Sequence, residues 1–177
     1  MRYADQCFRY TEDQTCYIYT GKCVFSKVDW EVRIPKDQLY HYRCNGLWRE
    51  GALLPIEREF LWSGISPRGW VQTFGLEFEQ IEQMVLYLIK MHPNHIYQKC
   101  GSLQVCSYVD GGDGKGCIFG QAISFLDPSL DLHHSEGITR LLNRLGVEAT
   151  EDEENWASDI QKKQDKGRKW DELINTA

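Results

Sequence analysis

The residues best placed to carry out chemistry lie in a glycine-rich segment, residues 104–126. The segment begins with β-branched and aromatic residues, continues as DGGDGKG over residues 110–116, and ends in apolar residues at helical spacing. A strand, a glycine loop and a helix can hold a phosphate group, because backbone N–H groups at a helix start point toward an anion. The candidate ligand-binding residues are Gly112, Gly114, Lys115 and Gly116.

The loop completes none of the motifs that bind a nucleotide or a calcium ion. A P-loop places Ser or Thr directly after its lysine to hold magnesium, whereas a glycine follows Lys115. A dinucleotide fingerprint would need glycine at Phe119. A calcium loop needs acidic residues at alternate positions, but Asp110 and Asp113 are three apart. We therefore expect a glycine turn, with a ligand-binding loop as the alternative.

Cys117, at the expected start of the helix, is the candidate nucleophile. A helix N-terminus can lower the pKa of a thiol, and His133 or His134 could act as the base. The neighbours Ile118 and Phe119 favour a buried, unreactive thiol instead. We therefore expect no catalytic residue, with Cys117, His133 and His134 as the alternative set.

A zinc site is the remaining chemical possibility for the cysteines. Cys100, Cys106 and Cys117 could bind zinc together with a histidine, yet the chain contains no C-x2-C pair. We expect neither a metal nor a cofactor.

The composition of the 177-residue chain indicates a folded protein with one core or two small modules. Apolar residues make up 42% of the chain, which also contains six tryptophans. The first residues contain no apolar run, so we expect a cytoplasmic protein whose seven cysteines are mostly free thiols. The longest apolar run, residues 84–89, is too short to span a membrane. A net charge of −6 argues against direct binding of nucleic acid.

The elements that would position these residues fall into two sections that meet at Phe74-Gly75. The first section, residues 1–75, predicts a small antiparallel sheet with short helices. Strands are expected at 14–20, 22–26 and 30–34 with a turn at Gly21-Lys22, and helices at 36–44 and 56–62 and after Pro67. We expect the inward side chains to include Leu39, Tyr40, Trp70 and Phe74.

The second section, residues 76–177, predicts a mostly helical module with one β-hairpin at the glycine loop. Helices are expected at 76–91, from residue 118, at 136–145 after a Ser135 cap, and from the Thr150 capping box to residue 166. The acidic residues 151–154 complement the dipole of that last helix. Trp170, Leu173 and Ile174 are expected to anchor the C-terminus, so that the fold class is α+β.

Most tryptophans are expected in the core. A tryptophan left exposed would mark a binding face. The residues concerned are Trp48, Trp62, Trp70, Trp156 and Trp170.

The first section contains the segment LPIEREFLWSGISPRGW, which resembles small uncharacterised proteins of bacteriophages that infect actinobacteria. The residues that carry the resemblance are Leu54, Pro55, Arg58, Glu59, Ser63, Gly64, Ile65 and Trp70. Many of these relatives carry paired cysteines that would form a zinc ribbon. This sequence has Tyr19 and residues 66–69 at those places, so the resemblance implies that the zinc site is absent or replaced.

The second section is similar to phage and actinobacterial proteins of unknown function. The matching residues are Tyr108, Cys117, Ile118, Gly120, Gln121, Ala122, Gln161, Gln164, Asp165, Gly167 and Trp170. These relatives have no known activity. Together with the acidity, the small size and the lack of a complete catalytic set, the resemblances favour a phage-type accessory protein that binds and modulates a host or phage protein without catalysis, an inhibitor of host defence being one form. The alternatives are a small enzyme or ligand binder centred on Cys117 and the glycine loop, and an acidic mimic of nucleic acid motivated by residues 148–154.

Overall fold

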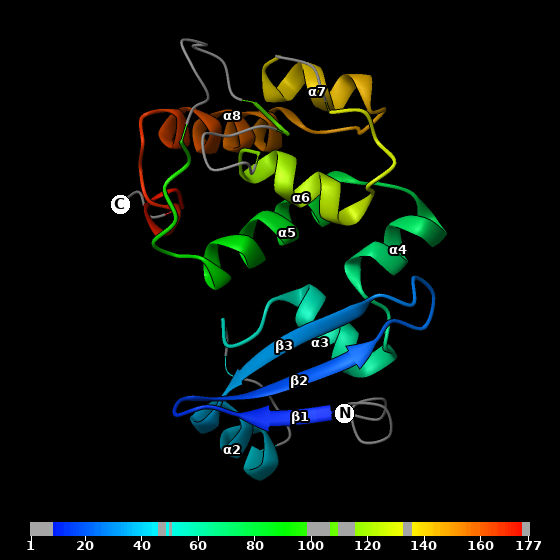
Figure 1. Ribbon diagram of the computed structural model, residues 1–177, viewed down its shortest axis with the longest axis vertical. Coiled ribbons are helices and arrows are strands. Elements are labelled where there is room, and N and C mark those ends of the chain that lie inside the picture. The colour runs from blue at the N-terminus through cyan, green and yellow to red at the C-terminus, as the bar shows by residue number, and fades with distance from the viewer. Residues whose placement is uncertain are drawn as a thin grey trace. The chain divides into compact units, whose positions relative to one another are not determined.

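The computed structural model of the chain describes residues 9–45, 49, 51–98, 107–109, 116–132 and 136–174. Its internal contacts divide the chain into two compact units, Met1–Gly75 and Leu76–Ala177. The first unit combines an antiparallel sheet with helices, and the described part of the second unit is built from helices (Figure 1). The α+β fold class predicted from the sequence is confirmed.

The sheet of the first unit consists of β1 (Arg9–Glu12), β2 (Cys16–Lys22) and β3 (Asp29–Pro35), paired in that order. All pairs are antiparallel, and one face of β3 is buried through Trp30, Val32 and Ile34. The turn expected at Gly21-Lys22 is wrong, because both residues belong to β2 and the chain reverses between Cys23 and Val28. Gly21 pairs with Trp30 across the sheet, a contact that local sequence cannot reveal.

Among the described residues of the first unit, the sheet is followed by α2 (Lys36–Asn45), α3 (Pro55–Ser63) and α4 (Pro67–Phe74). Prolines begin α3 and α4, as predicted, and Gly64 ends α3 in the left-handed conformation with φ 77°. The ring of Phe60 on α3 packs edge-on against Trp30 at 6.5 Å between centroids, which joins the helix to the sheet.

Two side chains expected to face inward in these helices are exposed. Tyr40 is 72% exposed and Phe74 is 58% exposed, while Leu39 is buried and Trp70 is half-buried. The ring of Phe74 lies 4.6 Å from that of Trp70, so the two aromatic residues pack on each other at the surface of α4.

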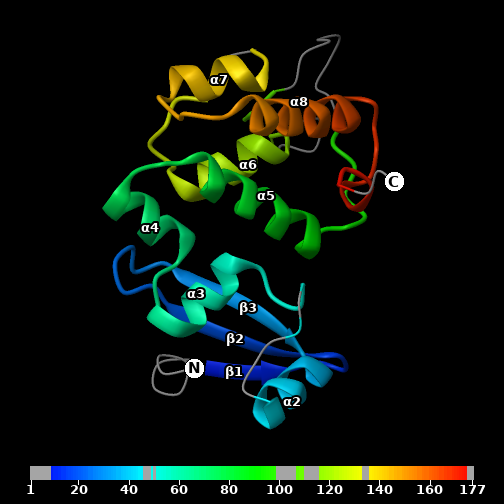
Figure 2. The same cartoon turned by 180° about the vertical axis from the view of Figure 1, so that it is seen from behind.

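The second unit contains α5 (Phe78–Met91), α6 (Ile118–Leu126), α7 (Ile138–Arg144), α8 (Glu151–Asp165) and the short 3-10 helix η1 (Trp170–Glu172). Helix α6 packs on α5 and α7 packs on α8 (Figure 2). The predicted Thr150 capping box is present, since Thr150 Oγ1 accepts from the N–H of Glu153 and the Glu153 carboxylate accepts from the N–H of Thr150. The Ser135 cap lies outside the described residues.

The C-terminal segment is fastened to the loop after α5. The backbone N–H of Trp170 donates to the backbone carbonyl of His95 at 3.0 Å, and the centroids of the two side-chain rings lie 4.3 Å apart. Trp170 and Leu173 are buried, as predicted, whereas Ile174 is exposed, contrary to the prediction.

Candidate functional site

The glycine loop singled out in the sequence falls mostly outside the described residues. This holds for Gly112, Gly114 and Lys115, and for the first half of the expected strand at 104–109. Residues 107–109 are described and are not a strand, although Ser107 accepts a hydrogen bond from the N–H of Cys117 at 2.9 Å. Where the hairpin was predicted, residues 107–109 therefore lie close to residues 116–117 without forming a strand.

Gly116 and Gly120 permit that close approach. A Cβ atom on either glycine would overlap the backbone carbonyl of Tyr108. Glycine at these positions is therefore required by the packing of α6 against residues 107–109. Gly116 has a structural explanation that involves no ligand.

The candidate nucleophile Cys117 is fully buried at the N-cap of α6. The burial expected from its apolar neighbours is thus found. His133 and His134, the candidate bases, lie outside the described residues. A buried thiol is closed to an external substrate in this conformation, so the geometry of Cys117 offers no support for catalysis.

Two glutamines of α8 complete the starts of α6 and α7. Neither helix has a side-chain cap of its own. Gln164 Oε1 accepts from the Ile118 N–H at 2.8 Å, and Gln161 Oε1 accepts from the Ile138 N–H at 3.0 Å. These amides are among those that a helix leaves without an internal partner. Two residues of the C-terminal resemblance are therefore explained by packing of the fold.

Tyr108 is the centre of the same buried network. Its hydroxyl donates to the carbonyl of Glu136 at 2.8 Å and lies 3.3 Å from Gln161 Nε2. The tyrosine thereby links residues 107–109 to the start of α7 and to α8.

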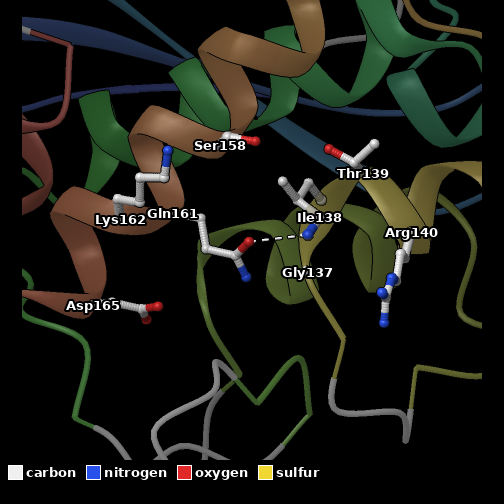
Figure 3. Close-up of a pocket in the computed structure, with 8 residues that line it drawn as sticks. All are labelled: Gly137, Ile138, Thr139, Arg140, Ser158, Gln161, Lys162 and Asp165. Atoms are coloured by element: carbon white, nitrogen blue, oxygen red, sulfur yellow. Dashed lines mark hydrogen bonds between the residues drawn. The ribbon is translucent and has the colours of Figure 1, made fainter.

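A hollow of about 420 Å³ lies between α7 and α8 (Figure 3). Its two cations, Arg140 and Lys162, form no ion pair within the described part of the chain. Figure 3 shows them on opposite sides of the hollow, with Gln161 between them and Asp165 on the Lys162 side. Cations that do not converge cannot clamp one oxyanion, so we assign no ligand to this hollow.

A second cysteine environment, at Cys23, was not predicted from the sequence. Cys23 lies directly after β2, is 1% exposed, and meets the start of α4. Its Sγ accepts hydrogen bonds from the N–H groups of Ser66 (3.2 Å) and Ser26 (3.4 Å). The two serine hydroxyls are 3.2 Å apart, and a Cβ on Gly69 would lie only 2.5 Å from the sulfur.

The Cys23 thiol has a lowered pKa. Burial raises this pKa, but the hydrogen bonds from Ser26 and Ser66 outweigh burial and bring it down to about 7 from 9.0. No other side chain among the described residues hydrogen-bonds to the sulfur, so a general base is lacking there. Cys23 is thus a buried, hydrogen-bonded thiol that is partly ionised near neutral pH.

The Cys23 cluster includes two of the residues, Ser66 and Gly69, at which the resemblance would place zinc-ribbon cysteines, but not Tyr19. Tyr19 lies within β2, opposite Val32, while Cys23 and Ser26 meet Ser66 and Gly69. One thiol with two hydroxyls does not fit the thiolate and imidazole ligands of structural zinc. No group of three or more His, Cys, Asp or Glu residues is placed to hold a metal ion within the described ranges. The C-x2-S and S-x2-G spacings could have pointed to this cluster.

Trp62, on α3, is more exposed than the other tryptophans that the structure describes. It is 60% exposed, whereas Trp30 and Trp170 are buried and Trp156 is half-buried. Trp48 lies outside the described residues. An exposed tryptophan is the feature expected of a binding face.

A group of eight carboxylates, the acidic pole, gathers where α5 and α8 begin. Its members are Glu77, Glu79, Glu82, Glu148, Glu151, Asp152, Glu153 and Glu154. None of them forms an ion pair with another described residue. Residues from both segments line a hollow of about 480 Å³. Burial, Glu153 and Glu79 raise the pKa of Glu82, so the carboxylates repel one another.

Comparison of the chain with protein-family models, curated proteins and solved structures found no match. Across the described residues, no helix has both the length and the apolar character needed to cross a bilayer.

Proposed function

We propose that this protein is a non-enzymatic accessory protein of phage type, which acts in the host cytoplasm by binding and modulating a host or phage protein. Inhibition of a host defence protein is one form that this function takes. The resemblances in both halves of the sequence support the phage-type origin. The exposed indole of Trp62 is the observation that carries the binding function.

The exposure of Trp62 supports a binding role because α3, the helix that carries it, is packed against the first unit. Phe60 and Leu61, its neighbours on α3, are buried against the first unit. Tryptophan contributes a large apolar area to an interface and is enriched among the residues that dominate binding energy. A rigid helix presents that area without first losing conformational freedom.

The two cysteine environments favour binding over catalysis. Cys117 is buried, and the sulfur of Cys23 is hydrogen-bonded to backbone amides without a neighbouring base. A cysteine nucleophile needs both access and a base within reach.

The test is quantitative purification of the tagged protein from cells of an actinobacterial host. We expect one stoichiometric protein partner with wild type, and at least about tenfold less of it with Trp62→Ala. Phe74→Ala, which removes another exposed aromatic side chain of the same unit, is the matched control. Purification of wild type with no partner at all would contradict a protein-binding function.

An acidic mimic of nucleic acid is the second candidate, favoured by the acidic pole. Carboxylates without ion pairs resemble a phosphate backbone in charge, and a basic nucleic-acid-binding protein would be the target. If this candidate is right, a DNA oligomer competes with the protein for the purified partner. Glu79→Gln with Glu148→Gln should then weaken binding, while Trp62→Ala should not.

A further inference from the structure

We infer that the outward face of α3 docks into an apolar pocket bordered by carboxylates on the partner protein, with Trp62 entering the pocket and Arg58 pairing at its rim. This inference rests on the proposed binding function and specifies the chemistry of the partner. It concerns the first unit alone.

The helix is held so that this face points outward. Glu57, Phe60 and Leu61 form its buried side, and Phe60 packs on the sheet through Trp30. At the start of the helix, Glu57 Oε2 accepts from the N–H of Leu54 at 2.8 Å. The inward side is thus fixed by packing and by a hydrogen bond, which sets the direction of the opposite side.

The outward face is a single stripe. Pro55, Arg58 and Trp62 are exposed, and their spacing of three and then four residues places them along one side of the helix. Arg58 and Trp62 therefore lie about 6 Å apart along the axis. This is the spacing with which helices insert anchor residues into a groove.

The positive charge of Arg58 on this stripe indicates which charge the partner surface should carry. The guanidinium of Arg58 forms no ion pair with a described residue. Glu59, on the other flank of Trp62, is half-buried and so less available than Arg58. A carboxylate on the partner, one helical turn from the indole pocket, would complement Arg58.

Apolar surface continues beyond the end of α3. The turn after β2 is joined to the residue that ends α3, since the N–H of Val24 donates to the carbonyl of Gly64 at 3.0 Å. Val24 and Phe25 are both exposed. The turn therefore places exposed apolar residues near the C-terminal end of α3, which favours a folded protein surface as the occupant.

Membranes and nucleic acids fit this face less well. Nine-residue α3 has one short exposed stripe with one cation, whereas interfacial helices combine a broad apolar face with several Lys or Arg residues. Nucleic-acid binding needs a basic surface, and the first unit has ten basic and nine acidic residues.

The test is photo-crosslinking in actinobacterial host cells with p-benzoylphenylalanine in place of Trp62. Peptide sequencing by mass spectrometry then identifies the partner segment in contact. We expect a protein adduct whose contact segment contains Asp or Glu next to apolar residues. Adducts to a basic segment, to lipid or to nucleic acid would overturn the inference.

Charge variants give an independent readout on the purified pair. Arg58→Glu should weaken binding by about tenfold or more, Arg58→Lys should restore part of it, and added salt should reduce the difference. Arg9→Glu makes the same charge change at an exposed residue of β1 and should leave binding unchanged.

The outcomes separate this inference from the proposed function. The same crosslinker is also placed at the exposed residues Tyr40 and Phe74. A partner that crosslinks only through Tyr40 or Phe74, and that is unaffected by Arg58→Glu, would overturn the α3 interface while leaving protein binding intact. Failure to capture any protein from all three positions would overturn both.

Discussion

At the scale of single residues, Cys23 shows how hydrogen bonds from two serines can offset the effect of burial on the pKa of a thiol. Its sulfur is buried, which by itself disfavours the thiolate, yet hydrogen bonds from the side chains and backbone N–H groups of Ser26 and Ser66 lower its pKa to about 7. Cys117 is also buried, but its own N–H is directed to Ser107 and it supplies no side-chain cap to α6. The two buried cysteines therefore differ in the hydrogen bonds around them.

The lowered pKa of Cys23 predicts a pH-dependent stability. The folded thiol ionises at a lower pH than the unfolded thiol, so its stabilising contribution is complete above pH 9.0 and is lost as pH falls through about 7. The difference in unfolding free energy between wild type and Cys23→Ala should therefore grow from pH 7 to 9, by at most about 2–3 kcal/mol. Denaturant unfolding of both proteins measures this difference. A constant difference across the range would show that the pKa is not lowered.

At the scale of elements, α8 organises the described part of the second unit by completing other helices. Gln161 and Gln164 lie on its buried side and satisfy the first amides of α7 and α6. The pairing explains why these helices begin at Ile138 and Ile118 without side-chain caps of their own. Two polar residues on the buried face of α8 thus fix the positions of the neighbouring helices α6 and α7.

Replacement of Gln164 should therefore destabilise the second unit. Gln164→Leu keeps a similar side-chain volume but leaves the Ile118 N–H buried without its acceptor, at a cost of about 1–3 kcal/mol. Thermal or denaturant unfolding measures the loss. Asn155→Leu, at an exposed position of the same helix, is the control and should change stability little. Equal stabilities for Gln164→Leu and wild type would refute the capping role.

At the scale of the whole molecule, negative charge is concentrated in the second unit. The first unit has ten basic and nine acidic residues, and the second has ten basic and seventeen acidic residues. Eight of the seventeen form the acidic pole at the starts of α5 and α8. The helix dipoles favour carboxylates at these ends, but carboxylates from both helices also repel one another.

Removal of the Glu82 charge, which is disfavoured first by burial and then by that repulsion, should stabilise the protein. Because the pKa of Glu82 is raised in the folded state, unfolding free energy falls as pH rises from 4.5 through the raised value. Glu82→Gln should then raise stability at pH 7, by roughly 0.5 kcal/mol because solvent screens the group. The gain should shrink at pH 4 and in high salt. Thermal unfolding across pH and salt checks this, and a gain insensitive to both would point to packing.

The sequence by itself determined the class of fold and most helix ends. Pro55 and Pro67 begin helices because their fixed φ suits a first turn, Gly64 ends one because it accepts a positive φ, and the Thr150 box caps another. These devices act within a few residues of sequence and can be read locally. The same locality explains the predicted burial of Cys117 beside Ile118 and Phe119.

Tertiary structure alone decided which side chains meet and which face solvent. Gly21 is part of β2 because it pairs with Trp30, and Ser66, 43 residues from Cys23, adds to the hydrogen bonds from nearby Ser26 that lower the pKa of Cys23. Tyr40, Trp62 and Phe74 are exposed because other residues of their helices, such as Leu39 and Phe60, occupy the core. The size of an aromatic side chain sets how much apolar area it can bury, but only the packing of the other elements determines whether that area is covered.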